Sequence, residues 1–219
     1  MTAFAKTYLT NKERIPAALL ISSYLFGMVV IAHGLISGFV YLTSLHLLLC
    51  TVLILITHRP MPSPRIWIWL VVCYALGWTA EYVGVHYKWL FGEYIYGDVL
   101  GPKVYAIPLI IGVNWILVIY GVCTTLNMLF PTLNRVFKAI FAAFLLVALD
   151  YLIEPVAIKL DFWTWMLGTP PTQNFIGWLG VGLIQTSLFY LIVPFTENRL
   201  APVLVLLQVI FFSYLSIFG

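Results

Sequence analysis

The stretch that decides the fold class runs from Ile15 to His58 and reads IPAALLISSYLFGMVVIAHGLISGFVYLTSLHLLLCTVLILITH. It contains no Asp, Glu, Lys or Arg. A membrane-spanning helix needs about 20 predominantly apolar residues, so the stretch is long enough for two spans. The small and polar residues Gly34, Ser37 and Gly38 interrupt it, which predicts helices over residues 15–36 and 39–57.

The composition of the whole chain indicates the same class. Of 219 residues, 63% are hydrophobic and 9% are charged, whereas a soluble domain carries roughly 25% charged residues. The first apolar run is too long for the apolar region of a signal peptide and lacks a clear cleavage site, so we predict a retained span. The sequence therefore predicts an all-α polytopic membrane protein with a single transmembrane domain over residues 1–219.

Five further apolar runs complete a predicted set of seven spans. They cover residues 66–87, 105–128, 136–158, 175–194 and 200–218. The segment from His58 to Arg65 holds three prolines and is predicted as a non-helical basic loop. Irregular connections are expected over 88–104 and 159–174, with Trp163 and Trp165 interpreted as interfacial anchors.

The basic residues divide unevenly between the two sides of a seven-span chain. Eight of the eleven fall on the side of the N-terminus: Lys6, Lys12, Arg14, Arg59, Arg65, Arg135, Lys138 and Arg199. The other three are Lys88, Lys103 and Lys159. By the positive-inside rule we predict a cell (inner) membrane protein with a cytoplasmic N-terminus and an outside C-terminus. Membrane lipids are expected as its surroundings, and no nucleic-acid partner is expected.

Three acidic residues fall inside predicted spans. They are Glu81 in the third span, and Asp150 and Glu154 in the fifth. A carboxylate at the centre of a span costs ~2.5–3.5 kcal/mol, so such residues indicate function by default. Asp150 and Glu154 lie four positions apart, which places them on one helix face, and Pro155 is expected to weaken the helix beside Glu154. A carboxylic acid in apolar surroundings tends to stay protonated and can serve as an acid.

The alternative for these acids is a structural role, in which they hold the bundle together through ion pairs or hydrogen bonds. Three such groups in a chain with eight acidic residues favour function. No metal site is expected, because the four histidines lack ligand spacing such as HExxH and the three cysteines lie in apolar runs. Asn114 lies inside a span, where polar side chains typically bond neighbouring helices.

Two segments carry motifs in a distinctive order. The first extends from Glu81 to Trp115 and contains FGEYIY at 91–96 and LGP at 100–102. The second extends from Asp150 to Trp178 and contains DYLIEP at 150–155, WTW at 163–165 and NFIGW at 174–178. Together they resemble the membrane-bound carotenoid biosynthesis family that includes carotenoid 1,2-hydratases of the bisanhydrobacterioruberin hydratase type. The chain departs from the family pattern at Asp161 and at Thr169–Pro171, where glycine is frequent.

The resemblance implies addition of water across the terminal C1=C2 double bond of an acyclic carotenoid end group, giving a tertiary alcohol. No metal, flavin or nicotinamide cofactor is implied. We predict Asp150 or Glu154 as the acid, with Glu81 as the other member of the catalytic group. The substrate and water are expected to contact Asn114, Trp115, Tyr94, Tyr96, Asn174 and Trp178. The implied partners are a lipid-soluble carotenoid and water, and association with other enzymes of the pathway is left open.

Three alternative functions share some of these features. A carotenoid end-group cyclase would protonate the same double bond and close a ring instead of capturing water. A retinal-binding protein would need a lysine in its last helix, and residues 200–219 contain none. A transporter also holds acids inside the membrane, but it is expected to show internal repeats, and none is evident in the sequence.

Overall fold

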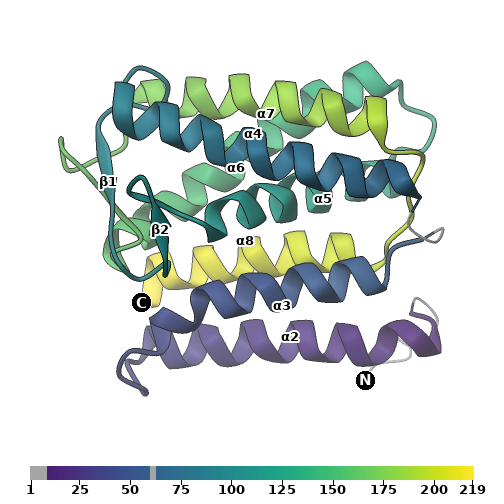
Figure 1. The fold of residues 1–219 in the computed structure, drawn as a ribbon. Helices are drawn as coiled ribbons and strands as arrows, with labels where there is room; N and C mark the ends of the chain where they lie inside the picture. The colour runs from purple at the N-terminus through teal and green to yellow at the C-terminus, as the bar shows by residue number, and fades with distance from the viewer. Residues whose placement is uncertain (1–8, 60–62) are drawn as a thin grey trace.

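The computed structural model describes residues 9–59 and 63–219. Within this part of the chain, seven helices are long and apolar enough to cross a membrane. Their bounds are α2 (Asn11–Ala32), η1 with α3 (Phe39–Leu42 and Thr43–Ile56), α4 (Pro64–Tyr87), α5 (Ile110–Leu129), α6 (Arg135–Lys159), α7 (Thr172–Ile192) and α8 (Leu200–Phe218). The helices lie side by side, with α2 starting at one end of the bundle and α8 finishing at the other (Figure 1). The predicted all-α, multi-pass membrane fold with seven spans is confirmed.

The first two helices separate where the small residues predicted a break. Gly34 and Gly38 adopt φ angles of 59° and 72°, in the left-handed region that favours glycine, and the chain turns between them. The first helix starts at Asn11, earlier than predicted, because Thr10 and Glu13 form a capping box at its beginning. Lys6, which was predicted to lie on the basic side, is outside the described residues.

The basic loop is shorter than predicted. Helix α4 begins at Pro64, so Pro64 and Arg65 belong to its first turn. Proline is well tolerated there, because the first N–H groups of a helix lack an intrahelical acceptor in any case. Residues 60–62 of the predicted loop lie outside the described residues.

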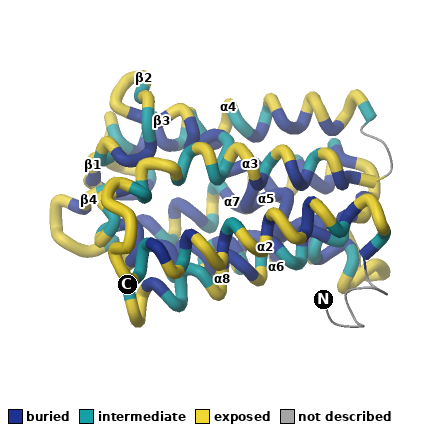
Figure 2. The backbone as a smooth tube through the Cα atoms, turned by 90° about the horizontal axis from the view of Figure 1, so that it is seen from below, coloured by how far each residue is buried: buried dark blue, intermediate teal, exposed yellow. Residues whose placement is uncertain are grey.

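Helix α5 forms the centre of the bundle. It packs against α3, α4, α6, α7 and α8, and 83% of the residues in its 18-residue apolar stretch are buried. The helix is apolar on all sides, as expected for one surrounded by others. The outer helices instead alternate buried and exposed positions, and their exposed side chains are largely apolar (Figure 2). Such a surface suits contact with lipid.

Two short antiparallel ribbons occupy the end of the bundle at which α8 finishes (Figure 1). Strand β1 (Tyr94–Tyr96) pairs with β4 (Trp163–Trp165), and β2 (Lys103–Val104) pairs with β3 (Ile107–Pro108). The prediction of irregular connections here was therefore wrong in part. The predicted span over 105–128 also began too early, because the β2–β3 hairpin takes up its first residues and α5 starts only at Ile110.

Helix α6 continues through Pro155 to Lys159. This agrees with the predicted span over 136–158, and the weakening expected at Pro155 does not interrupt the helix, because proline removes only one N–H donor and α6 packs closely against α7. Glu154 is accordingly a buried helical residue. Helix α7 starts at Thr172 rather than near 175, which places Asn174 in its first turn.

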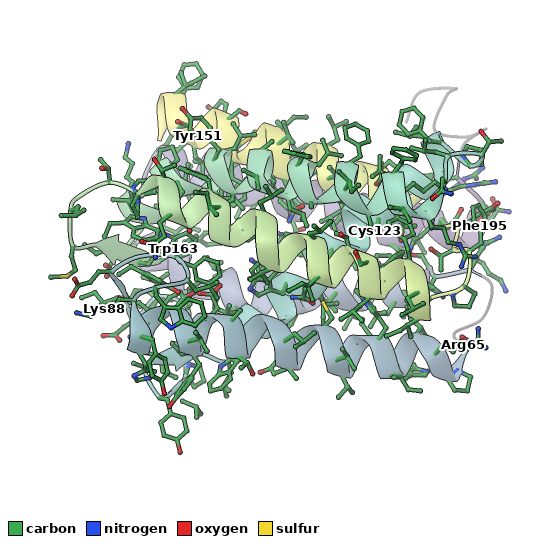
Figure 3. The ribbon with its side chains drawn as sticks, turned by 90° about the horizontal axis from the view of Figure 1, so that it is seen from above. Arg65, Lys88, Cys123, Tyr151, Trp163 and Phe195 are labelled. Carbon is green, nitrogen blue, oxygen red and sulfur yellow. The ribbon has the colours of Figure 1, made fainter. Side chains whose placement is uncertain are left out.

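The described basic residues gather at the two ends of the bundle. Arg65 marks the end opposite the ribbons, whereas Lys88 and Trp163 both lie at the ribbon end (Figure 3). Of the eight residues predicted for the N-terminal side, the seven other than Lys6 belong to helix starts and connections at the first of these ends. Which end faces the cytoplasm stays a prediction.

Candidate active site

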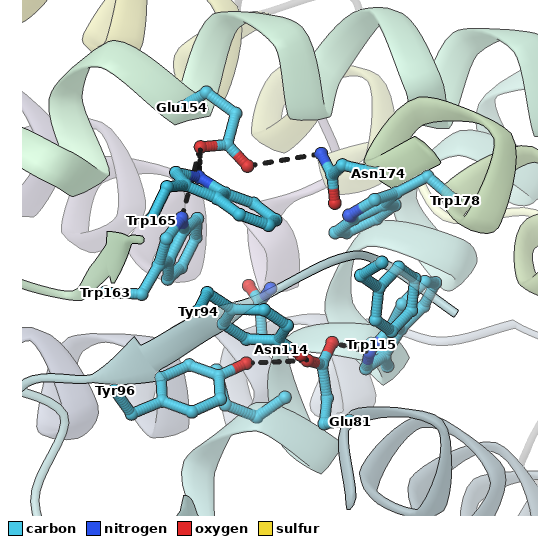
Figure 4. A pocket seen from close by; sticks show the side chains of 12 residues that line it. Glu81, Tyr94, Tyr96, Asn114, Trp115, Glu154, Trp163, Trp165, Asn174 and Trp178 are labelled. Carbon is cyan, nitrogen blue, oxygen red and sulfur yellow. Dashed lines mark hydrogen bonds between the residues drawn. The ribbon is translucent and has the colours of Figure 1, made fainter. Parts of the chain in front are cut away.

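A small cavity lies among α4, α5, α6, α7 and the β1–β4 ribbon (Figure 4). Its volume of about 30 Å³ gives room for about two water molecules. Seven of its twelve lining side chains are aromatic: Phe91, Tyr94, Tyr96, Trp115, Trp163, Trp165 and Trp178. The others are Glu81, Asn114, Glu154, Asn174 and Ile111. The cavity thus combines two carboxyl groups with a largely aromatic wall.

Glu154 forms one wall of the cavity and accepts three N–H groups. Its Oε2 accepts the indole N–H of Trp165 at 2.8 Å and that of Trp163 at 3.1 Å. Its Oε1 accepts from the Asn174 amide nitrogen at 3.2 Å. A carboxyl group offers about four lone-pair sites, so these donors leave about one site unoccupied.

Glu81 forms the opposite wall and also accepts three hydrogen bonds. The Tyr94 and Tyr96 hydroxyls donate to its Oε2 at 2.5 and 2.8 Å, and the indole of Trp115 donates to Oε1 at 3.2 Å. Burial raises the pKa of both tyrosines well above the ordinary value, and the nearby Glu81 raises it further. Both hydroxyls therefore stay protonated and remain donors.

The β1–β4 ribbon connects the two acids. Tyr94 stands opposite Trp165 in the ribbon, and Tyr96 stands opposite Trp163. Side chains two positions apart on a strand point to the same face, so all four rings share one face of the ribbon. On that face the tyrosines bond Glu81 and the tryptophans bond Glu154 (Figure 4). One small ribbon thereby fixes both carboxyl groups relative to each other.

Asp150 does not line the cavity. Its side chain is fully buried behind Glu154, one helical turn earlier in α6. The amide nitrogen of Asn174 donates to Asp150 Oδ2 at 2.8 Å as well as to Glu154, so it bridges the two acids. The other oxygen, Oδ1, has no hydrogen-bond partner among the described residues. Asp150 therefore reaches the cavity only through Asn174, as a positioning residue.

Trp115 and Trp178 stack at a third wall, with ring centroids 4.3 Å apart and planes tilted by 24°. Gly77 leaves the space for this pair. A Cβ at Gly77 would lie 2.5 Å from Trp115 Cδ1 and Cγ, far inside van der Waals contact. Gly77 precedes Glu81 by one turn of α4, so the space left at Gly77 lets the Trp115 indole lie against α4 beside the Glu81 carboxyl group.

We expect Gly77→Ala to displace the Trp115 indole and to lower the free energy of unfolding by about 1–3 kcal/mol, because the added methyl has no room. Thermal unfolding in detergent and the tryptophan emission spectrum check this. The matched control is Gly180→Ala, since Gly180 is helical, exposed and has nothing within 4 Å of an added Cβ. Unchanged stability and emission in Gly77→Ala would contradict the close packing of Trp115 against Gly77.

The structure brings together most of the residues that the sequence predicted. Glu81, Glu154 and all six predicted contact residues line the cavity, whereas Asp150 lies behind it. The interpretation of Trp163 and Trp165 as interfacial anchors was wrong, because their indoles bond Glu154. The alternation of aromatic residues at 94 and 96 and at 163 and 165 was the signal for a ribbon. Phe91 and Ile111 also line the cavity and were not predicted.

The three acids accept hydrogen bonds from neutral side chains. These donors are hydroxyl, indole and amide groups. Within residues 9–59 and 63–219, no group of three or more His, Cys, Asp and Glu side chains is arranged to hold a metal ion. The arrangement is suited to placing a proton and a water molecule beside an apolar substrate.

The fold and this cavity define a multi-pass helical membrane protein with a buried, acid-containing aromatic pocket. Comparison with known families identifies it further. The chain belongs to the carotenoid biosynthesis protein family, whose sequence profile matches residues 38–219. The match covers both motif segments and every residue that lines the cavity.

One similar protein is the bisanhydrobacterioruberin hydratase of Haloarcula japonica. It is 27% identical over 144 residues, which cover 59% of this chain and 46% of that protein. The aligned part thus spans about half the length of this relative. No solved structure matches the chain.

Proposed function

We propose that this protein hydrates the terminal C1=C2 double bond of an acyclic carotenoid end group and yields a tertiary alcohol. The observation that carries the proposal is a pair of carboxyl groups on opposite walls of an aromatic cavity with room for about two water molecules. Membership of the carotenoid biosynthesis family supports a polyene substrate. The name of the Haloarcula japonica relative supports hydration as the reaction.

In this proposal Glu154 is the acid. Its O–H bond breaks, and the π electrons of the substrate form a new C–H bond at C2. The three N–H groups on Glu154 then stabilise the carboxylate that remains. Asp150 and Asn174 hold Glu154 in place. We assign the acid to Glu154 rather than Asp150 because only Glu154 lines the cavity.

Proton transfer leaves a positive charge at the tertiary carbon C1. Aromatic faces stabilise a nearby cation through their quadrupoles, and the cavity presents seven aromatic rings. The stacked Trp115 and Trp178 and the ribbon side chains Tyr94 and Trp165 are the proposed cation wall. In this proposal the cation therefore survives long enough for a water molecule to attack it.

Glu81 is the proposed base for water capture. A water lone pair forms the C1–O bond, and Glu81 takes the proton that this water loses. The hydroxyls of Tyr94 and Tyr96 both donate and accept, so they can pass protons, unlike the indoles on Glu154. A proton then returns from Glu81 to Glu154 through water. The sum is addition of one water molecule with no change in oxidation state, so we propose that no cofactor takes part.

Expression in a host that accumulates an acyclic carotenoid tests the proposed reaction. We expect pigments whose mass has increased by one water molecule for each end group that has reacted. A product of unchanged mass whose NMR spectrum shows a cyclic end group would overturn hydration in favour of a cyclase. Unchanged precursor, with the protein present in the membrane fraction, would overturn both.

We also propose the topology that the basic residues predict, in the cell (inner) membrane. The N-terminus is cytoplasmic, and the ribbon end of the bundle faces outward. In this orientation the acid cavity lies nearer the outer surface, because the ribbon forms part of its wall. Residues 1–219 act as one transmembrane domain in this proposal.

A further inference from the structure

A second, much larger cavity lies between α2, α3 and α8. Its volume is about 310 Å³, ten times that of the acid cavity. The lining is mostly apolar and includes Phe26, Leu45, Phe211 and Phe212. Phe26 is 55% exposed and Leu45 is 63% exposed, so the outer wall opens on the lipid-facing side of the bundle.

The inner end of this cavity lies next to the acid cavity. Asn114 lines both cavities. Ile153 and Phe162 line the larger one, and each directly precedes a residue of the acid cavity, Glu154 and Trp163. The larger cavity therefore extends from the lipid side to Asn114, on whose other side the acid cavity lies.

We propose that this second cavity binds the end of an acyclic polyene chain, with the terminal double bond placed at Asn114 and directed toward Glu154. The assignment rests on the proposed function and names the substrate path to the same acids. An engineered apolar cavity of about 150 Å³ holds one benzene ring. The present cavity therefore has room for on the order of a dozen carbon atoms, and the rest of a long polyene extends into the bilayer between α2 and α3.

An acyl chain of a membrane lipid is the competing occupant, because it is also long and apolar. The position next to the acid cavity favours the polyene. A reactive double bond gains from a position beside Asn114 and Glu154, whereas a saturated chain gains nothing from that position. The two occupants are separated by direct competition.

Gly27 offers a way to fill the cavity without disturbing its surroundings. It lines the cavity, and an added Cβ would lie 3.7 Å from Phe39 and 3.9 Å from Phe211, which is ordinary contact. A leucine at this position directs its remaining carbons into the space for the chain. The matched control is Gly180→Leu, because Gly180 is helical, exposed and open.

The first experiment measures binding of a lycopene-type carotene to the full-length protein in lipid nanodiscs through quenching of tryptophan fluorescence. We expect Gly27→Leu to weaken binding at least about tenfold, since a few misplaced carbons in an apolar pocket change affinity by about 10- to 200-fold. Gly180→Leu should bind as the wild type does. Equal binding by Gly27→Leu and wild type would overturn the proposed path.

A second experiment keeps the test valid if Gly27→Leu does not fold. The smaller substitution Gly27→Cys introduces a thiol at the cavity wall, whereas the described native cysteines are buried and line neither cavity. We expect the carotene to slow alkylation of this thiol at least about tenfold, with no protection by added phospholipid and none in Gly180→Cys. Protection by phospholipid alone would assign the cavity to an acyl chain and overturn the proposal.

These measurements also separate the two proposals. Carotene binding that depends on Gly27, without any hydrated product, would keep the binding path and reject hydration. Hydrated product formed equally by wild type and Gly27→Leu would keep hydration and reject the path.

Discussion

Replacing Glu154 by Gln is expected to lower the rate of tertiary alcohol formation by about 100- to 10,000-fold, the usual contribution of a general acid. The amide cannot supply the proton for C2, although it retains the size of the side chain. The measurement is initial product formation by purified protein in liposomes, with equal amounts of folded protein confirmed by size-exclusion chromatography in detergent.

Two further variants show whether this loss is specific. Glu197→Gln makes the same chemical change at an exposed position at the opposite end of the bundle and should leave the rate unchanged. Asp150→Asn should lower the rate less than Glu154→Gln, because Asp150 reaches the cavity only through Asn174. A larger loss in Asp150→Asn, with Glu154→Gln near wild type, would move the acid to Asp150.

Replacing Glu81 by Gln has the second largest expected effect. Without a base for the attacking water, formation of the alcohol should fall by about 100-fold or more. Protonation by Glu154 remains available, so the cation should lose a proton or close a ring, and the product mixture should shift toward isomers of unchanged mass. Liquid chromatography with mass spectrometry measures the ratio of alcohol to isomer.

The ratio of products distinguishes the two carboxyl groups. Glu154→Gln should lower all products together, whereas Glu81→Gln should change their proportions. Equal loss of alcohol and isomers in both variants would contradict the separate roles of acid and base. The exposed Glu197→Gln variant is again the control.

Much of the fold could be predicted because membrane insertion imposes strong patterns on sequence. The segment from Ile15 to His58 contains no Asp, Glu, Lys or Arg. In a membrane such a segment must satisfy its own backbone hydrogen bonds, which favours a pair of spanning helices. Glu81, Asp150 and Glu154 stood out for the same reason, since carboxyl groups are rare in spans. The spacing of four residues correctly placed Asp150 and Glu154 near each other, and Asn174 joins them.

The parts that sequence did not predict depend on contacts between distant segments. The β1–β4 ribbon pairs residues about 70 positions apart, and its strands are only three residues long. Its aromatic residues resemble those of an interfacial belt until the pairing directs them onto Glu81 and Glu154. Likewise, only Glu154 lines the cavity. The spacing of one helical turn between Asp150 and Glu154 does not predict which of the two side chains faces it.

Isotope labelling tests the central claim most directly. Purified protein in liposomes is given an acyclic carotene in water enriched in both deuterium and oxygen-18. The account predicts a tertiary alcohol that carries one solvent-derived deuterium on C2 and one oxygen-18 on C1 at each reacted end. A product that gains deuterium but no oxygen, or that gains oxygen without deuterium at C2, would contradict hydration through protonation by the enzyme.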